Sequence, residues 1–241
     1  MINLMQGDCL ERMKEIPDGS VDLVLTSPPY NMNLRISNGR YVSRQIVKEL
    51  STKYDDYDDN LPMEDYFSLL KNIVGECLRV SDLVFFNIQP LTGNKPAVYR
   101  LIGEYHDKIK ELIVWDKVNA QPAIGQSVLN SQFELIIIFQ NSKPESRAFK
   151  SATFERGTLS NVWSVKRERQ PIKGLGAAFP SELARTVIEN FSEPGQTILD
   201  PFLGSGTTGI EAVKSGRNFI GIELSQARLD AATQRIVGSM V

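Results

Sequence analysis

The sequence is poor in the side chains that build metal centres and disulfide frameworks. Its 241 residues include one histidine and two cysteines, and Cys9 and Cys77 stand far apart, outside any CxxC spacing. A zinc cluster needs several such ligands at close spacing, so none can be assembled from this sequence. We therefore expect a cytoplasmic protein without a metal site.

Long apolar runs and a basic start are also missing. The longest run, residues 135–139, falls far short of the roughly 20 residues that a membrane-spanning helix requires. The stretch Met1–Leu4 lacks the positive charge of a secretory signal. The sequence therefore predicts neither membrane insertion nor secretion.

An overall basic excess is absent, although the charges are unevenly placed. A net charge of −2 argues against a surface that coats nucleic acid by charge alone. Residues 55–59 with Glu64 and Asp65 form an acidic block, which we expect to face away from phosphates. An ordinary solvent-exposed surface explains this block and a second, basic block equally well. The basic block comprises Lys143, Arg147, Lys150, Arg156, Lys166, Arg167, Arg169 and Lys173.

The residues that are present are typical of one globular α/β domain over residues 1–241. Short β-branched or aromatic runs alternate with segments of helical spacing. Two stretches follow neither period, a loop near residues 31–60 that we expect to be mobile and a segment near 141–173. The expected strands are Val21–Leu25, Leu83–Phe86, Leu112–Trp115, Leu135–Phe139, Thr197–Leu199 and Asn218–Ile222. The expected helices are Met63–Leu78, Ser181–Phe191, Thr208–Ser215 and Ser225–Ile236, with Ser181 and Ser225 as N-caps.

A glycine-rich turn follows the strand near Thr197, with Gly204, Gly206 and Gly209 in a GxGxxG pattern. Such a turn lets the backbone approach a ligand, and Glu223 at the end of the next strand suits ribose hydroxyls. The pattern alone is weak evidence. Nicotinamide dehydrogenases share it, and a turn that serves only packing is the other alternative.

Two features favour S-adenosylmethionine over a dinucleotide. Few residues follow Glu223, whereas a dinucleotide fold needs a second mononucleotide half. Asp200 ends the strand before the turn, where its carboxylate can meet the ammonium of an amino-acid-bearing nucleoside. The sequence therefore predicts an S-adenosylmethionine site here.

A second motif, Ser27-Pro28-Pro29-Tyr30, directly follows the first expected strand. That position is the carboxyl end of the sheet, where α/β proteins bind ligands. Taken alone, the prolines would be a rigid strand exit and Tyr30 a packed aromatic. However, a serine or aspartate, two prolines and an aromatic form the motif by which DNA amino-methyltransferases are recognised.

The chemistry of amino methylation explains these residue types. A base amino nitrogen is a poor nucleophile, so a catalyst should accept hydrogen bonds from the NH2 group, and Ser27 Oγ and the Pro28 carbonyl are suitable acceptors. Tyr30 can stack on a base that has been flipped out of the duplex. No cysteine follows a proline, as a ring-carbon methyltransferase would require, and base deamination would need the zinc site that is missing.

The order of the two motifs, catalytic first and cofactor last, resembles the circularly permuted β class of DNA amino-methyltransferases. Further matches to this family span nearly the whole chain: Gly7–Leu10, Ile113–Lys117, Glu134–Phe139, Asn161–Trp163, Phe179–Leu183 and Gly221–Ser225. One departure is that no histidine stands shortly before Phe179, where members often have one.

The resemblance implies a doubly wound α/β, Rossmann-like S-adenosylmethionine-dependent methyltransferase sheet in permuted motif order, with an antiparallel strand near Leu135. It also implies the cofactor contacts. Asp8 would lie near the adenine, Phe179 and Pro180 beside the methionine end, and Glu223 on the ribose. The turn residues Asp200, Phe202, Gly204, Ser205 and Gly206 would surround the amino acid.

These residues predict a site-specific methyltransferase of double-stranded DNA in a bacterium or a phage-infected cell. Serine before the prolines favours cytosine N4 by family statistics, and adenine N6 stays open. Methylation of RNA or of a protein amide, and a catalytically idle nucleic-acid-binding module, are more distant alternatives. Target reading is expected near residues 141–173, shared with residues 31–53. The resemblance leaves a homodimer and a cognate restriction enzyme open as further partners.

Overall fold

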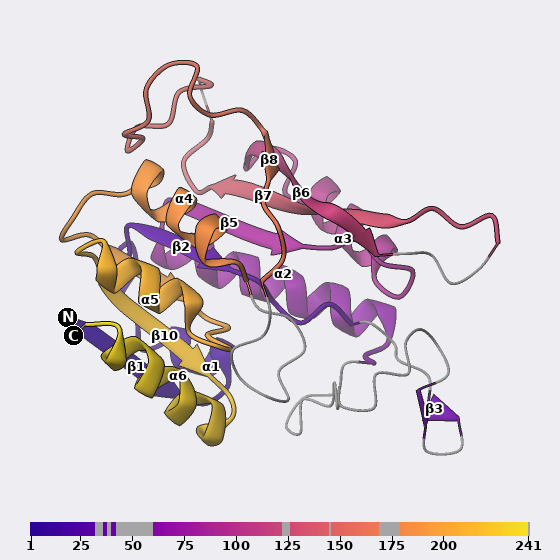
Figure 1. The fold of residues 1–241 in the computed structure, drawn as a ribbon, viewed down its shortest axis with the longest axis horizontal. Coiled ribbons are helices and arrows are strands. Elements are labelled where there is room, and N and C mark those ends of the chain that lie inside the picture. Colours follow the sequence, from indigo (N-terminus) through magenta and orange to yellow (C-terminus); the bar gives the residue numbers. More distant parts are fainter. Residues whose placement is uncertain are drawn as a thin grey trace.

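The computed structural model describes residues 1–31, 36–37, 40–41, 60–121, 126–144, 146–168 and 179–240. Its strands and helices are arranged in three layers (Figure 1). The strands are β1 (Ile2–Gln6), β2 (Leu23–Thr26), β3 (Ile36–Ser37), β4 (Arg40–Tyr41), β5 (Leu83–Ile88), β6 (Ile109–Gln121), β7 (Ser131–Gln140), β8 (Val162–Ser164), β9 (Thr197–Asp200) and β10 (Asn218–Glu223). The helices are α1 (Cys9–Met13), α2 (Met63–Val80), α3 (Lys95–Glu104), α4 (Ser181–Phe191), α5 (Thr207–Lys214) and α6 (Gln226–Gly238).

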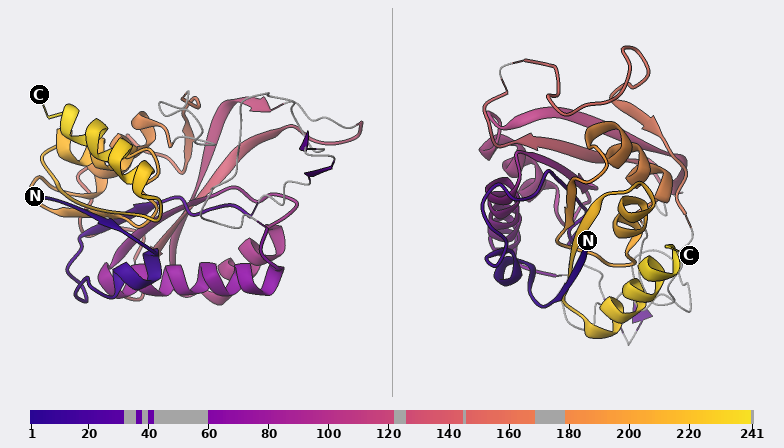
Figure 2. Two further views of the ribbon diagram at one scale, coloured as in Figure 1. Left: turned by 90° about the horizontal axis from the view of Figure 1, so that it is seen from below. Right: turned by 90° about the vertical axis from the view of Figure 1, so that its left-hand side faces the viewer.

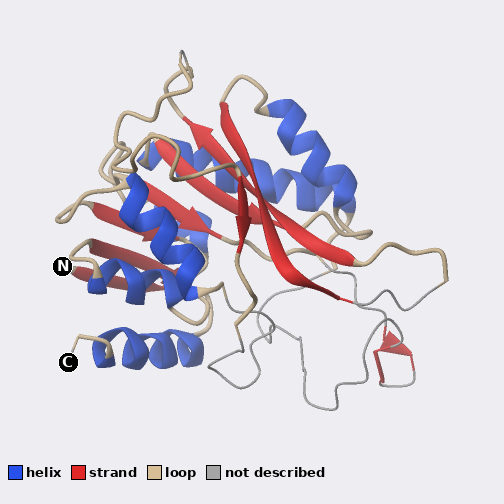
Figure 3. Cartoon of the chain, turned by 45° about the horizontal axis from the view of Figure 1, so that its top comes forward, coloured by secondary structure: helices blue, strands red, loops and turns tan. Residues whose placement is uncertain are grey.

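The main sheet has eight strands in the order β1-β10-β9-β2-β5-β7-β6-β8. Strands β1, β10, β9, β2 and β5 are mutually parallel, whereas β7 is antiparallel to both of its neighbours. The antiparallel strand that the family resemblance implied near Leu135 is therefore present. Strands β6 and β7 extend past the carboxyl ends of the parallel strands as a long hairpin (Figure 3).

The chain winds outward in two directions from the centre of the sheet. After β2 it passes through α2 to β5 on one side, and after β9 it passes through α5 to β10 on the other. The neighbouring strands β2 and β9 therefore flank the topological switch point, where α/β sheets bind ligands beyond the strand ends. The doubly wound α/β class that the sequence predicts is confirmed.

Two apolar cores lie between the sheet and the helices on its two faces, and Figure 2 shows these layers. Helices α1, α2 and α3 cover one face of the sheet, and α4, α5 and α6 cover the other. Helix α4 forms because its apolar residues recur at helical spacing and all meet the core: Leu183, Ala184, Val187, Ile188 and Phe191. Strand β5 is buried along its whole length, which explains why it reads as a nearly continuous apolar run.

Several expected boundaries were wrong. Strand β2 begins at Leu23 because Val21 forms only an isolated bridge to Ser81. Ser181 is the first residue of α4 and Pro180 is its N-cap, whereas Ser225 does occupy the N-cap of α6. Strands β1, β3, β4 and β8 and helices α1 and α3 were not predicted, and both strands of the β6–β7 hairpin are longer than expected. No helix in the described ranges is both long and apolar enough to cross a membrane.

Candidate active site

The Ser-Pro-Pro-Tyr motif leaves the carboxyl end of β2, and its backbone is held by two helical segments. Tyr66 in α2 donates a hydrogen bond of 2.7 Å to the Pro29 carbonyl, and Asn94, the N-cap of α3, donates one of 2.6 Å to the Tyr30 carbonyl. Asn31 follows with φ of +50°, and its buried side chain bonds both backbone groups of Leu61. The direction of the chain through the motif is therefore fixed.

A buried side-chain network extends from this motif. Tyr30 donates its hydroxyl proton to Glu134 Oε2 at 2.7 Å, and Ser27 Oγ lies 3.0 Å from the same phenol oxygen. Asn87 Nδ2 lies 2.6 Å from the Tyr30 oxygen, 2.9 Å from Glu134 Oε2 and 3.4 Å from Ser27 Oγ. The hydroxyls of Ser27 and Tyr30 are thus part of one hydrogen-bonded cluster.

A buried ion pair lies behind this network. Lys117 Nζ is 3.2 Å from Glu134 Oε1, and the two side chains are 1% and 10% exposed. Burial lowers the pKa of Lys117, while the Glu134 carboxylate acts in the opposite direction. Burial, reinforced by the Glu134 charge, raises the pKa of Tyr30 well above its usual value. Tyr30 is therefore a neutral phenol and acts as a hydrogen-bond donor.

Asp200 ends β9 on the other side of the switch point. Its Oδ1 accepts hydrogen bonds of 3.0 Å from Thr26 Oγ1 and from the Phe202 backbone N–H. Burial raises the pKa of Asp200 to about 6, against the lowering effect of hydrogen bonds from Thr208, Phe202 and Thr26. These donors are all neutral, so a cationic ligand group would stabilise the buried carboxylate.

Glu223 and Asp8 lie at the ends of the next two strands, β10 and β1. The Glu223 carboxylate accepts the backbone N–H groups of Gly204 at 3.0 Å and Ser225 at 3.2 Å. Its own carbonyl accepts the N–H of Gly7 at 3.0 Å, which places Asp8 beside it. Asp8 is exposed and caps α1 through one oxygen, Oδ1. The sequence did not predict this capping role.

Two glycines of the turn, Gly206 and Gly209, are required by packing. A Cβ on Gly206 would lie 3.2 Å from Ala232 Cβ and 3.3 Å from Ile236, and the residue has φ of +79°. A Cβ on Gly209 would lie 2.6 Å from the Phe219 ring. The turn needs these glycines because α5, α6 and β10 approach one another closely there.

The remaining predicted cofactor residues lie around the same edge of the sheet. The Phe179 ring packs on Trp115 with centroids 6.2 Å apart, and Pro180 is the N-cap of α4. The Ser205 hydroxyl lies 3.1 Å from Thr207 Oγ1 inside the turn, so this side chain is occupied by local bonding. The structure thus brings the predicted residues together around the ends of four strands, β1, β2, β9 and β10, although Ser205 and Asp8 make structural bonds of their own.

The described parts of the basic segment near 141–173 lie at two different edges of the sheet. Residues 141–144 and 146–150 lie near the amino end of β5, where the Asn141 N–H bonds the Asp82 carbonyl, and so lie away from Ser27. Arg167 instead follows β8 at the carboxyl edge and donates to the Asn119 carbonyl at 3.3 Å. Arg169 and Lys173 lie outside the described residues.

Two residues of the acidic block, Glu64 and Asp65, are described by the structure. Glu64 and Asp65 begin α2, the helix whose Tyr66 holds the catalytic motif, so they lie at the site's edge of the sheet. Glu64 is paired there with Arg100 at 2.7 Å. The described residues do not include 55–59 or most of the loop near 31–60. The expected mobility concerns these same loop residues.

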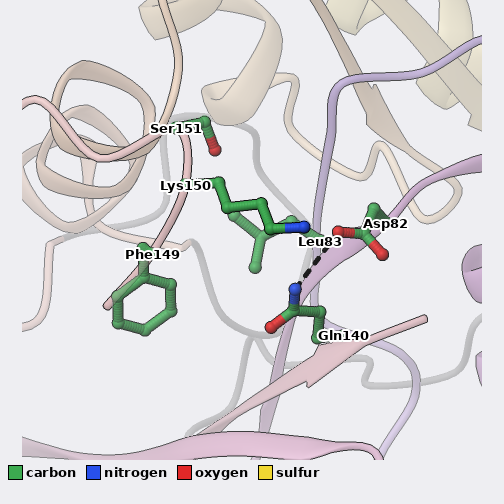
Figure 4. A pocket seen from close by; sticks show the side chains of 6 residues that line it. All are labelled: Asp82, Leu83, Gln140, Phe149, Lys150 and Ser151. Atoms are coloured by element: carbon green, nitrogen blue, oxygen red, sulfur yellow. Dashed lines mark hydrogen bonds between the residues drawn. The ribbon is translucent and has the colours of Figure 1, made fainter. Parts of the chain in front are cut away.

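A small cavity at the amino end of β5 is not a ligand site (Figure 4). Its volume of about 20 Å³ has room for about one water molecule. A hydrogen bond of 3.3 Å between Gln140 and Asp82 crosses it. The lining residues are Asp82, Leu83, Gln140, Phe149, Lys150 and Ser151.

Sequence reasoning did not assign Asn87, Lys117 and Glu134 to the site. Lys117 and Glu134 stood within family-matched stretches, but nothing in the sequence showed that they pair. The available signal for Asn87 was its polarity within the apolar run of β5, because a buried polar residue in a central strand needs a partner.

Comparison with known proteins identifies the family. The model of the DNA methylase family (N6_N4_Mtase) matches residues 21–234, so the chain belongs to this family. The type II methyltransferase M.HinfI of Haemophilus influenzae is 28% identical over 248 residues, which cover 97% of this chain and 67% of the relative.

Solved structures agree in fold. The PvuII DNA methyltransferase (cytosine-N4-specific) has a TM-score of 0.69 at 17% identity, covering 99% of this chain and 91% of that chain. The complex of M1.HpyAVI with S-adenosylmethionine has a TM-score of 0.59 at 19% identity, covering 98% and 100%. The predicted family, an S-adenosylmethionine-dependent DNA methyltransferase, is confirmed together with its fold class and cofactor.

Proposed function

We propose that this enzyme methylates N4 of cytosine in double-stranded DNA, with Ser27, Pro28, Pro29 and Tyr30 as its catalytic motif. Serine before the prolines favours cytosine, and the observation that supports methylation of an amino group is the placement of Ser27. Its hydroxyl stands at the carboxyl end of β2, next to the strand whose Asp200 accepts a bond from Thr26. An acceptor for a base amino group and a carboxylate for the cofactor therefore adjoin each other at the switch point.

The residues at the strand ends fit S-adenosylmethionine. The buried Asp200 carboxylate, which lacks a cationic hydrogen-bond donor among the described residues, suits the ammonium of the cofactor's amino acid. Glu223 suits the ribose hydroxyls and Asp8 the adenine. Phe179, Pro180, Phe202, Gly204, Ser205 and Gly206 would form the rest of the cofactor site. When bound, the cofactor supplies an electrophilic methyl group.

The chain's own contribution is orientation and hydrogen bonding. Ser27 Oγ and the Pro28 carbonyl accept the two amino hydrogens, which favours the pyramidal nitrogen that attacks. The Tyr30 ring stacks on the flipped base, and Pro28 and Pro29 hold the carbonyl in place. The reaction needs no covalent enzyme intermediate, since the amino nitrogen is itself the nucleophile.

The modified atom is found by digesting DNA from cells that express the enzyme and analysing the nucleosides by mass spectrometry. We expect N4-methyldeoxycytidine in this digest. N6-methyldeoxyadenosine alone would replace the base assignment with adenine and would leave the catalytic roles in place. Unmodified DNA from an expressing strain, with modified RNA or protein, would refute the proposed substrate. Long-read sequencing of the same DNA locates the recognition site.

A further inference from the structure

The hydrogen bonds around Tyr30 have only one consistent direction. A phenol has one proton, and Tyr30 gives it to the Glu134 carboxylate, which paired with Lys117 can only accept. The phenol oxygen must therefore act as acceptor in its other contacts. It accepts from Asn87 Nδ2 at 2.6 Å, so the 3.0 Å contact with Ser27 is a bond donated by the serine hydroxyl.

This direction determines what Ser27 offers to a substrate. A serine hydroxyl has one proton and two lone pairs, and here the proton is used in the bond to Tyr30. Toward the base, Ser27 Oγ can then only accept. A free serine would instead rotate and could donate to a carbonyl oxygen as readily as it accepts from an amino group.

Asn87 shows that the carboxylate controls the network. Its amide must turn Nδ2 toward Glu134, because Oδ1 would be repelled by the carboxylate. That orientation leaves Oδ1 buried without a hydrogen-bond partner among the described residues. Such an orphaned acceptor costs about 1–3 kcal/mol, so the network tolerates a loss of stability to keep this arrangement.

We propose that Glu134, held by Lys117 and Asn87, is a positioning residue that fixes the direction of the hydrogen bonds. Ser27 then donates to Tyr30, and Tyr30 donates to Glu134. This direction makes the site select an exocyclic amino group over a ring carbonyl. The inference deepens the proposed function and rests on it. It applies equally to cytosine N4 and adenine N6, because both targets present N–H donors to Ser27.

The variant Glu134→Gln should reverse the direction of these hydrogen bonds while preserving the size of the side chain. The new amide donates to the Tyr30 oxygen, so the phenol proton turns to Ser27 and the serine proton turns to the base. A target amino group would then face a donor. We expect single-turnover methyl transfer to fall about a hundredfold, while S-adenosylhomocysteine affinity stays within twofold.

The readout is the preference for an amino base over its carbonyl analogue, because a purely structural role of Glu134 would leave this preference unchanged. The probes are two duplexes with the mapped site, one with the natural target base and one with its carbonyl analogue, uracil for cytosine or hypoxanthine for adenine. Binding is measured with S-adenosylhomocysteine present. The cost of extruding each base belongs to the DNA and cancels when two enzymes are compared. We expect Glu134→Gln to lower the amino-over-carbonyl preference at least about tenfold.

Glu211→Gln is the matched control, because Glu211 is also a buried carboxylate with a basic partner, Arg185 at 2.9 Å, but belongs to α5 outside this network. It should keep the wild-type preference. If Glu134→Gln does not fold, Tyr30→Phe provides the test, since it removes the acceptor of the Ser27 proton and should also reduce the preference.

An unchanged preference in Glu134→Gln, or in Tyr30→Phe where that variant is used, overturns the inference. This result can be distinguished from failure of the proposed function. If the proposed function were wrong, the wild-type enzyme itself would methylate neither base amino group.

Discussion

Thr26 donates a hydrogen bond of 3.0 Å to Asp200 across the boundary between β2 and β9. Thr26 immediately precedes the catalytic motif, and Asp200 immediately precedes the glycine turn. One buried bond therefore joins the strand that carries Ser27, the proposed base-binding residue, to the strand that carries Asp200, the proposed partner of the cofactor's ammonium group. It fixes the two half-sites relative to each other at the switch point.

Thr26→Val should remove this bond while keeping the shape of the side chain. The Asp200 carboxylate would lose a donor, so we expect the free energy of unfolding at pH 8 to fall by about 1–2 kcal/mol. S-adenosylhomocysteine should also bind more weakly, because the carboxylate is less well oriented. Urea denaturation and calorimetry measure the two effects. Thr233→Val, which removes a hydroxyl bond within α6, should leave cofactor affinity unchanged.

Asp200→Asn should stabilise the protein and abolish cofactor binding. The pKa of Asp200 rises from 3.8 to about 6 on folding, so the native state binds more protons between these values. Its contribution to stability is full below pH 3.8 and is lost as pH rises through about 6. A shift of this size corresponds to roughly 3 kcal/mol at pH 8.

The neutral amide that Asp200→Asn introduces avoids that loss, so the gain over wild type should appear in urea denaturation at pH 8 and shrink toward pH 4. A gain that does not depend on pH would contradict the assigned cause.

The sequence predicted the half-sites because each lies at a strand end. Ser27, Asp200 and Glu223 each follow a short apolar run, and parallel strands bring their carboxyl ends to one edge. The Asn87–Lys117–Glu134 cluster could not be predicted in this way. It depends on the register of β5 with β7 and of β7 with β6, which pairs Asn87 with Ile136 and Trp115 with Glu134. Local sequence does not encode that register.

The glycines show a second limit of sequence reasoning. A GxGxxG pattern is compatible both with an open approach to a ligand and with tight packing of helices on strands. Only the neighbours distinguish the two, and for Gly209 they are Phe219 and Ile236, which come from later elements. Short helices were missed for a related reason: α1 is one turn long, and its signal is the Asp8 cap rather than a repeating apolar pattern.

Gly209→Ala should destabilise the fold, although alanine is the better helix former. The new Cβ would lie 2.6 Å from the Phe219 ring and 2.7 Å from Ile236, so buried side chains must move. We expect a loss of about 1–3 kcal/mol in the free energy of unfolding, measured by urea denaturation. Gly103→Ala in α3 is the control, because its Cβ would meet nothing within 4 Å, and it should stabilise by about 0.4–1 kcal/mol. Equal effects of the two changes would refute the packing role.

Arg167→Gln should weaken DNA binding in a salt-dependent manner. Arg167 is exposed at the carboxyl edge of the sheet, on the same side as Ser27, and a phosphate contact there would release about one counterion. The slope of log affinity against log salt should therefore become less steep by about 0.9, uniformly across DNA sequences. S-adenosylhomocysteine affinity should not change.

Lys143→Gln provides the matched control for Arg167→Gln. Lys143 carries the same charge and is exposed, but it follows β7 at the amino end of β5, away from Ser27. If DNA is bound at the carboxyl edge, this substitution leaves the salt slope unchanged. A loss of slope in Lys143→Gln, with none in Arg167→Gln, would place the DNA at the opposite end of the sheet. It would then separate DNA binding from the Ser27–Tyr30 motif, because a base flipped at that end could not reach the Ser27 hydroxyl.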